Sequence, residues 1–288
     1  MCGIVGGVTE RNVVPILVEG LKRLEYRGYD SAGIAFQEQK KIALIKSLGR
    51  VQDLENKLNK NTSSTAGIAH TRWATHGIPS EKNAHPHVSN KNIYVVHNGI
   101  IENHEDLKSE LKSEGFKLYS QTDSEVIGHL IEFYKQRGMD FDSSVMKAIT
   151  RLKGAYALAV MDKNEPETLI GVRQSSPLVV GEGFDENFLA SDIMALSPVT
   201  NKFKFLDDGQ VAFVTKNKIS ISSKDGRAAK VPTKEVDSTA YTNDLNGYSH
   251  FMEKEIFEQP ESVQKLSLIH ISEPTRPRLI SYAVFCLK

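Results

Sequence analysis

The N-terminal stretch Met1-Cys-Gly-Ile-Val-Gly-Gly-Val8 governs how the rest of this sequence is interpreted. Residues 2–8 are short and apolar, which predicts a strand that begins at Cys2. An initial Met is removed when the next side chain is small, so we expect Cys2 to carry the free α-amine of the mature protein. A free Cys has a pKa of about 8.5 and an α-amine one of about 7.7–8.0. Because these values nearly match, the amine can take the thiol proton through a water and make Cys2 a nucleophile.

Two further segments supply what an amide-cleaving site needs beside its nucleophile. They are His70-Thr-Arg-Trp-Ala-Thr-His-Gly77 and His97-Asn-Gly-Ile-Ile-Glu-Asn-His104. Asn98 and Gly99, at the end of an apolar strand, offer a side-chain amide and a backbone N–H for a developing oxyanion. Arg72 can hold an α-carboxylate through two parallel hydrogen bonds, and Asp123 can hold an α-ammonium.

Each of these features has a simpler interpretation. A lone Cys near a terminus is usually inert, and Asn-Gly is usually a hairpin turn. A carboxylate such as Asp123 at the start of a predicted helix is usually a dipole partner. His85 and His87 lack nearby acidic or Cys partners in the sequence, which indicates loop structure more than a metal site. For each feature taken alone, the simpler interpretation prevails. The occurrence of all these features within one short span favours a functional site.

The spacing of apolar residues predicts the elements around these segments. Helices are expected at 12–28, 51–58 and 143–152, another begins at Asn103, and a capping box of Thr122 and Glu125 precedes a fifth. Short strands are expected at 32–36, 42–46, 66–70 and 93–97, with six more between 155 and 221. The loop between 70 and 93 is long enough to be functional. This order predicts an α+β fold of layered sheets with helices outside.

Composition limits the possible binding partners and the cellular compartment of the protein. Lys plus Arg equals Asp plus Glu at 36 each, so no basic field recruits nucleic acid. No apolar run approaches the roughly 18 residues of a membrane span, and no secretory signal is recognisable. The two cysteines, at positions 2 and 286, make no disulfide framework. We therefore expect a cytoplasmic protein without nucleic-acid or membrane partners.

At this point the motifs resemble a known family. Cys2-Gly-Ile-Val-Gly6 is similar to the start of the class II glutamine amidotransferases, which are N-terminal-nucleophile hydrolases. Longer strings are similar to one branch of that family, the glutamine–fructose-6-phosphate aminotransferases or glucosamine-6-phosphate synthases. These strings are Leu24-Glu-Tyr-Arg-Gly-Tyr-Asp-Ser-Ala-Gly33, the 70–77 segment, Asn83-Ala-His-Pro-His87 and Val96–His104. They argue against asparagine synthetase and amidophosphoribosyltransferase, which share the Cys-Gly start.

The resemblance implies a four-layer αββα sandwich and a set of roles. Cys2 would be the nucleophile with its own amine as base, and Asn98 and Gly99 would form the oxyanion hole. The family's glutamine-binding positions fall on Arg72, Thr75, His76 and Asp123. Trp73 would gate the passage of ammonia, and Arg27 would support the site near the N-terminus. The family implies neither a metal nor an organic cofactor.

The resemblance also shows a departure, because it stops near residue 265. Full-length members carry a second, sugar-isomerase half that takes fructose 6-phosphate, and they are expected to be homodimers. The predicted organisation is a glutaminase domain at 1–222, a linker at 223–246 and the first isomerase helix at 247–265. Residues 266–288 resemble translated vector or adapter sequence, so we predict a non-native tail that includes Cys286.

Two functions remain open from the sequence. The chain either hydrolyses glutamine to glutamate and ammonia without synthase activity, or binds glutamine with little turnover because the isomerase half is absent.

Overall fold

The computed structural model describes residues 2–39, 41–59, 61–74, 77–236, 248 and 251–272. The chain divides into two compact units, Met1–Ser238 and Thr239–Lys288. The second contains helix α6 (Phe251–Ser272), which has Pro260 inside it. The predicted change of character after residue 265 falls within this helix. Residues 237–246 of the predicted linker and residues 273–288 lie outside the described residues, so the domain boundaries stay a prediction.

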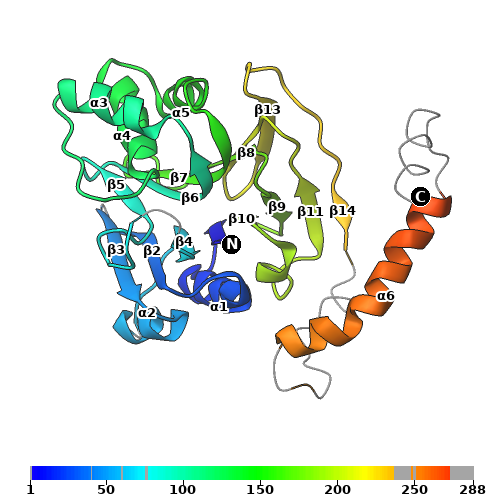
Figure 1. The fold of residues 1–288 in the computed structure, drawn as a ribbon. Helices are drawn as coiled ribbons and strands as arrows, with labels where there is room; N and C mark the ends of the chain where they lie inside the picture. Colours follow the sequence, from blue (N-terminus) through cyan, green and yellow to red (C-terminus); the bar gives the residue numbers. More distant parts are fainter. Residues whose placement is uncertain are drawn as a thin grey trace. The chain divides into compact units, whose positions relative to one another are not determined.

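The first unit is built on two antiparallel sheets (Figure 1). The strands of the larger sheet are β1 (Gly3–Thr9), β2 (Ser31–Glu38), β3 (Lys41–Leu48), β4 (Ala66–Arg72), β9 (Val179–Glu182), β10 (Glu186–Ala190), β11 (Lys202–Phe205) and β14 (Lys234–Glu235). Those of the smaller sheet are β5 (His87–Ser89), β6 (Ile93–Ile101), β7 (Gly154–Asp162), β8 (Leu169–Gln174), β12 (Gln210–Val214) and β13 (Ile219–Ser223). Their spatial orders are β14-β11-β9-β10-β1-β4-β2-β3 and β13-β12-β8-β7-β6-β5.

Helices cover the outer face of each sheet. The helices are α1 (Val14–Leu24), α2 (Val51–Lys57), α3 (His104–Ser113), α4 (Glu125–Gln136) and α5 (Phe141–Ile149), with short 3-10 turns η1 (Glu25–Arg27) and η2 (Ile193–Ala195). One apolar core joins α1 and α2 to the larger sheet, and another joins α3, α4 and α5 to the smaller. A third core fills the space between the sheets. These three cores separate four layers, which confirms the predicted αββα sandwich.

Successive side chains of β1 point to opposite faces of the larger sheet, and apolar residues lie on both faces. This is why β1 can lie in the middle of the sandwich. Ile4 and Val8 point into the core between the sheets, whereas Val5 points to α1 and packs in the core with Leu17. All of these side chains are buried. Burying each one stabilises the fold by about 1.5–3 kcal/mol. β1 is therefore fixed between β10 and β4, and Cys2 is fixed at its end.

The capping box predicted from Thr122 and Glu125 is wrong. Helix α4 begins at Glu125 itself, after Ser124, and no side chain caps it. The Glu125 carboxylate instead accepts hydrogen bonds from the backbone N–H groups of Tyr119 and Ser120 at 2.8 and 2.7 Å. The buried Glu125 carboxylate thus bonds N–H groups of the preceding loop instead of a backbone N–H at the start of its own helix. These bonds hold the loop in place.

Asn103 stands before α3 as predicted, but its side chain does not cap the helix. Its amide oxygen accepts from Lys153 N at 3.0 Å, and its amide nitrogen donates to Arg151 O at 3.0 Å. Asn103 therefore ties α3 to the chain that enters β7.

Candidate active site

Cys2 lies directly before β1 and beside the end of β4. The register pairs Gly3 with Thr71, which brings the next residues of β4 alongside Cys2. The backbone N–H of Trp73 points at the Cys2 sulfur, with 3.3 Å between nitrogen and sulfur. Burial raises the pKa of the Cys2 thiol, while the Trp73 N–H and the Arg72 charge act in the opposite direction. Because burial dominates, the thiol depends on a base to become a thiolate.

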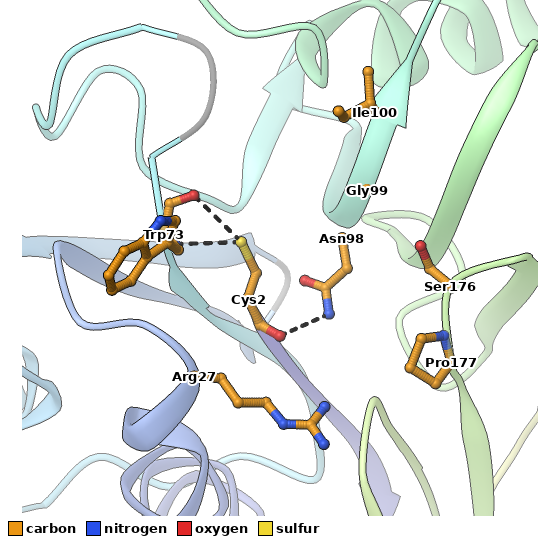
Figure 2. A pocket seen from close by; sticks show the side chains of 8 residues that line it. All are labelled: Cys2, Arg27, Trp73, Asn98, Gly99, Ile100, Ser176 and Pro177. Carbon is orange, nitrogen blue, oxygen red and sulfur yellow. Dashed lines mark hydrogen bonds between the residues drawn. The ribbon is translucent and has the colours of Figure 1, made fainter. Parts of the chain in front are cut away.

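Asn98 and Gly99 approach Cys2 from the other sheet, on β6 (Figure 2). The side-chain nitrogen of Asn98 donates to the backbone oxygen of Cys2 at 3.0 Å. Gly99 has a φ of +120°, and a Cβ there would lie 2.0 Å from the backbone oxygen of Ala155. Only glycine fits this position. A side-chain amide and a turned backbone therefore meet at Cys2, which is the arrangement that an oxyanion hole requires.

His70, on β4, was not assigned a role from the sequence. Its Nε2 lies 3.0 Å from Asn98 Oδ1 and 3.0 Å from the backbone oxygen of His97. The residue is buried, and burial lowers the pKa of its imidazole to about 3. A neutral imidazole therefore lies directly behind Asn98.

A small cavity of about 20 Å³ opens beside the thiol. It is lined by Cys2, Arg72, Trp73, His85, His97, Gly99, Thr122, Asp123 and Ser124. Arg72 and Asp123 are both buried, and they bring opposite charges to its wall. The Arg72 guanidinium donates to Gly77 O at 3.1 Å, and Asp123 accepts the Ile101 N–H at 2.8 Å. A space of this size holds about one water molecule.

A larger cavity of about 290 Å³ also borders Cys2. It is lined by Cys2, Arg27, Trp73, Asn98, Gly99, Ile100, Ser176 and Pro177 (Figure 2). Arg27, in η1, pairs with Asp192 and donates to the Tyr26 hydroxyl at 2.8 Å. Cys2, Trp73 and Gly99 line both cavities, so Cys2 stands at their junction.

Seven of the nine site residues predicted from the sequence line one or both cavities. They are Cys2, Arg27, Arg72, Trp73, Asn98, Gly99 and Asp123. The other two, Thr75 and His76, lie outside the described residues. Their predicted roles in binding, like those of the other seven, stay predictions.

Three residues at the site escaped the sequence analysis. One is His70. The second is Asp30, whose carboxylate accepts the backbone N–H of Ala74, next to Trp73. The third is Ser191, whose hydroxyl accepts the Ile4 N–H at 3.0 Å and so helps to hold β1. Asp30 and His70 fall within the 24–33 and 70–77 strings that resemble the family, which was the available signal.

The histidines at the start of β5 and in the loop before it pack against one another. The rings of His85 and His87 are 4.5 Å apart, and His85 lies 4.2 Å from His70. Within the described part of the chain, no three His, Cys, Asp or Glu side chains are arranged to hold a metal ion. The described helices also include none that is long and apolar enough to cross a membrane.

Comparisons with known proteins agree with this geometry. Residues 70–198 match a family described as a glutamine amidotransferase domain. The chain is 49% identical over 266 residues to a glutamine–fructose-6-phosphate aminotransferase (isomerizing) of Acinetobacter baylyi, covering 92% of this chain and 43% of that protein. The protein of the same name from Escherichia coli K12 is 48% identical over 268 residues, with 92% and 44% covered. The chain thus spans less than half the length of these relatives.

A solved structure shares the fold. Glutamine phosphoribosylpyrophosphate amidotransferase from B. subtilis superposes with a TM-score of 0.68 at 24% identity, over 77% of this chain and 49% of that one. At this identity the likeness concerns the fold alone. Taken with the two antiparallel sheets and the Cys2 site, these matches identify the chain as carrying a glutamine amidotransferase domain, homologous over 92% of its length to glutamine–fructose-6-phosphate aminotransferases.

Proposed function

We propose that Cys2 hydrolyses the side-chain amide of glutamine to give glutamate and ammonia. The observation that carries this proposal is the place of the Cys2 sulfur at the junction of two cavities, with Asn98 and Gly99 beside it. Few other reactions need a thiol, an amide donor and a glycine backbone at one point.

The proposed reaction begins when removal of Met1 exposes the α-amine of Cys2. The amine takes the thiol proton through a water, and the sulfur attacks the amide carbon of glutamine. Asn98 Nδ2 and the backbone at Gly99 stabilise the oxyanion. The amine then returns the proton to the departing nitrogen, ammonia leaves, and a thioester remains. Water cleaves the thioester, releases glutamate and restores the thiol.

The small cavity is the proposed place for the amino-acid end of the substrate. Arg72 would hold the α-carboxylate, and Asp123 would hold the α-ammonium. Thr75 and His76 are proposed to add contacts to the same substrate. Because the cavity holds about one water, glutamine requires its walls to move apart when it binds.

The larger cavity is proposed as the path for ammonia, with Trp73 at its border and Arg27 in its wall. In the full-length protein, the ammonia would pass to fructose 6-phosphate and give glucosamine 6-phosphate. That acceptor site, a homodimer and a cytoplasmic location remain proposals that rest on the relatives and on the sequence.

The chain offers a matched pair of variants for the test. Cys2→Ala should abolish ammonia release from glutamine, whereas Cys286→Ala, which changes the other cysteine, should retain it. Equal ammonia release by Cys2→Ala and the unmodified protein would eliminate Cys2 as the nucleophile.

The role of the α-amine has its own test. Insertion of Lys between Met1 and Cys2 keeps the thiol but blocks the amine, because methionine is not removed before a large residue. We expect activity to fall by about 10²–10⁴, the contribution of a general base. Mass spectrometry checks the N-terminus of both forms. Full activity in the extended form would assign the base to another group.

A second function, glutamine binding with little turnover, is favoured by one observation. Asn98 Nδ2 already donates to the Cys2 backbone oxygen, so this donor is engaged elsewhere and is not directed at an oxyanion. Calorimetry with glutamine, run beside the ammonia assay, distinguishes the two functions. Binding without release supports the binding module, and release supports the enzyme.

A further inference from the structure

We propose that His70 is a positioning residue, which holds the Asn98 side-chain amide so that its nitrogen faces the reacting carbon. This inference rests on the proposed function, since it names the residue that orients the oxyanion donor.

The imidazole of His70 carries its proton on Nε2. The His97 backbone oxygen can only accept a hydrogen bond, and it lies 3.0 Å from His70 Nε2. Nε2 must therefore carry the hydrogen. That N–H also faces Asn98 at 3.0 Å, so the Asn98 atom on this side has to be the acceptor oxygen. The tautomer of His70 thus determines the orientation of the amide.

The nitrogen of the Asn98 amide faces away from His70. With its oxygen held by His70, the Asn98 side chain presents Nδ2 to the opposite side, where it donates to the Cys2 backbone oxygen. A flipped amide would place its oxygen there instead. Two oxygens would then face each other, and a developing oxyanion would meet an acceptor in place of a donor.

The surroundings of the His70 ring keep it neutral. The residue is only 1% exposed, and its Nδ1 is buried without a hydrogen-bond partner. A second proton on Nδ1 would leave a buried charged donor unsatisfied. Burial accordingly lowers the pKa of the imidazole to about 3, so His70 donates only from Nε2 across the working pH range.

The surrounding structure keeps the ring in place. His70 lies in β4, paired with Ile4 on one side and with Gly33 on the other. A Cβ at Gly33 would lie 2.1 Å from the His85 backbone oxygen, so the glycine lets the loop carrying His85 pack close. The His85 ring then lies 4.2 Å from the His70 ring.

The experiment compares two substitutions in the complete chain. His70→Gln keeps an N–H donor near the Nε2 position, whereas His70→Leu removes it. We expect His70→Leu to lower kcat for glutamine hydrolysis at least 10-fold with KM changed less than 2-fold. An oxyanion donor acts in the transition state, and losing one entirely costs about 10²–10³ in kcat. His70→Gln should retain most of the activity.

A double-mutant cycle separates positioning from general structural damage. In an Asn98→Ala background, His70→Leu should cause no further loss of kcat, because no amide remains to be oriented. His129→Leu is the control for a buried His elsewhere. His129 Nδ1 lies 2.7 Å from the Ser89 hydroxyl, and its loss should lower stability but leave kcat unchanged. A further 10-fold loss in the Asn98→Ala background would overturn the proposal.

A measurement that does not need turnover distinguishes this inference from the proposed function. The nitrogen NMR shifts of the His70 ring should show a neutral imidazole with the proton on Nε2. Such a result supports the positioning role even if the chain only binds glutamine. A proton on Nδ1, or a cationic ring at neutral pH, would overturn it.

Discussion

Asn98 donates its side-chain N–H to the backbone oxygen of Cys2 at 3.0 Å, although 96 positions separate the two residues. The bond connects β6 of the smaller sheet to Cys2, which lies directly before β1 of the larger sheet. The end of the sandwich where β1 and β6 meet is therefore the candidate active site. In the proposed reaction this amide changes partner, from the Cys2 oxygen to the oxyanion of the substrate.

Replacing Asn98 tests that exchange. Asn98→Ala should lower kcat for glutamine hydrolysis by about 10²–10³ and change KM little, because it removes one oxyanion donor. Steady-state ammonia release measures both constants. Asn92→Ala is the matched control, since Asn92 lies in the turn before β6, outside both cavities, and its amide bonds Glu132 at 3.0 Å. An unchanged kcat for Asn98→Ala would remove Asn98 from the oxyanion hole.

Arg72 is expected to act in the binding of substrate. Arg72→Lys keeps the positive charge but loses the planar fork that matches a carboxylate, so KM should rise about 10-fold or more. Arg137→Lys, at an exposed pair with Glu114, should leave KM unaltered. Calorimetry with glutamine checks the affinity directly. If Arg72→Lys binds glutamine as tightly as the unmodified chain, another residue holds the carboxylate.

The Glu125 carboxylate predicts a pH dependence of stability. Burial raises its pKa, but hydrogen bonds from His129 and from the backbone of Tyr119 and Ser120 outweigh this, and the pKa falls to about 2. An unfolded Glu has a pKa of about 4.3. The folded state therefore favours the ionised form. Its stabilisation is fully present above about pH 4.3 and is lost as the pH falls toward 2.

Glu125→Gln should thus lower the free energy of unfolding at pH 7 by on the order of 2 kcal/mol, as expected for a buried charged hydrogen bond. The gap between variant and unmodified protein should narrow below about pH 4. Urea unfolding at a series of pH values measures this. Glu105→Gln, at an exposed position, is the control and should shift the midpoint little. A gap that stays constant from pH 7 to pH 3 would contradict the assignment.

Gly99 offers a test of backbone fit. Gly99 and Gly138 both have a positive φ, of +120° and +87°. A Cβ at Gly99 would lie 2.0 Å from Ala155 O, whereas a Cβ at Gly138 would meet nothing within 4 Å. Gly138→Ala should therefore cost about 1 kcal/mol of conformational strain. Gly99→Ala should cost clearly more and should also reduce glutamine hydrolysis. Equal losses of stability in the two variants would mean that the β7 backbone moves away from a Cβ at position 99 at little cost.

Most of the central strands could be predicted because each contains a short run of apolar residues between turns. β1 and the first four residues of β6 are continuous apolar runs, which is the expected pattern for strands buried on both faces. β11 was not predicted, because Lys202-Phe-Lys-Phe205 is short and has as many charged residues as apolar ones. It becomes a strand through pairing with β9, a partner about 20 positions earlier that no local pattern reveals.

The local capping rules failed where tertiary contacts offered better partners. Asn103 and Glu125 both have the residue type expected near a helix start, yet each bonds a different segment. Short-range propensity contributes about 1 kcal/mol at such positions. A buried polar group left without a partner costs as much or more, so the surrounding packing decides which partner is used.

By itself, the sequence determined the chemical groups and their order along the chain. It supplied a thiol at Cys2, an amide at Asn98, charges at Arg72 and Asp123, and alternating apolar strands that require a layered fold. Only the tertiary structure decided that His70 lies behind Asn98 and that Cys2 stands between two cavities. These relations depend on how one sheet packs against the other, which is settled by the apolar core between them and not by any local pattern.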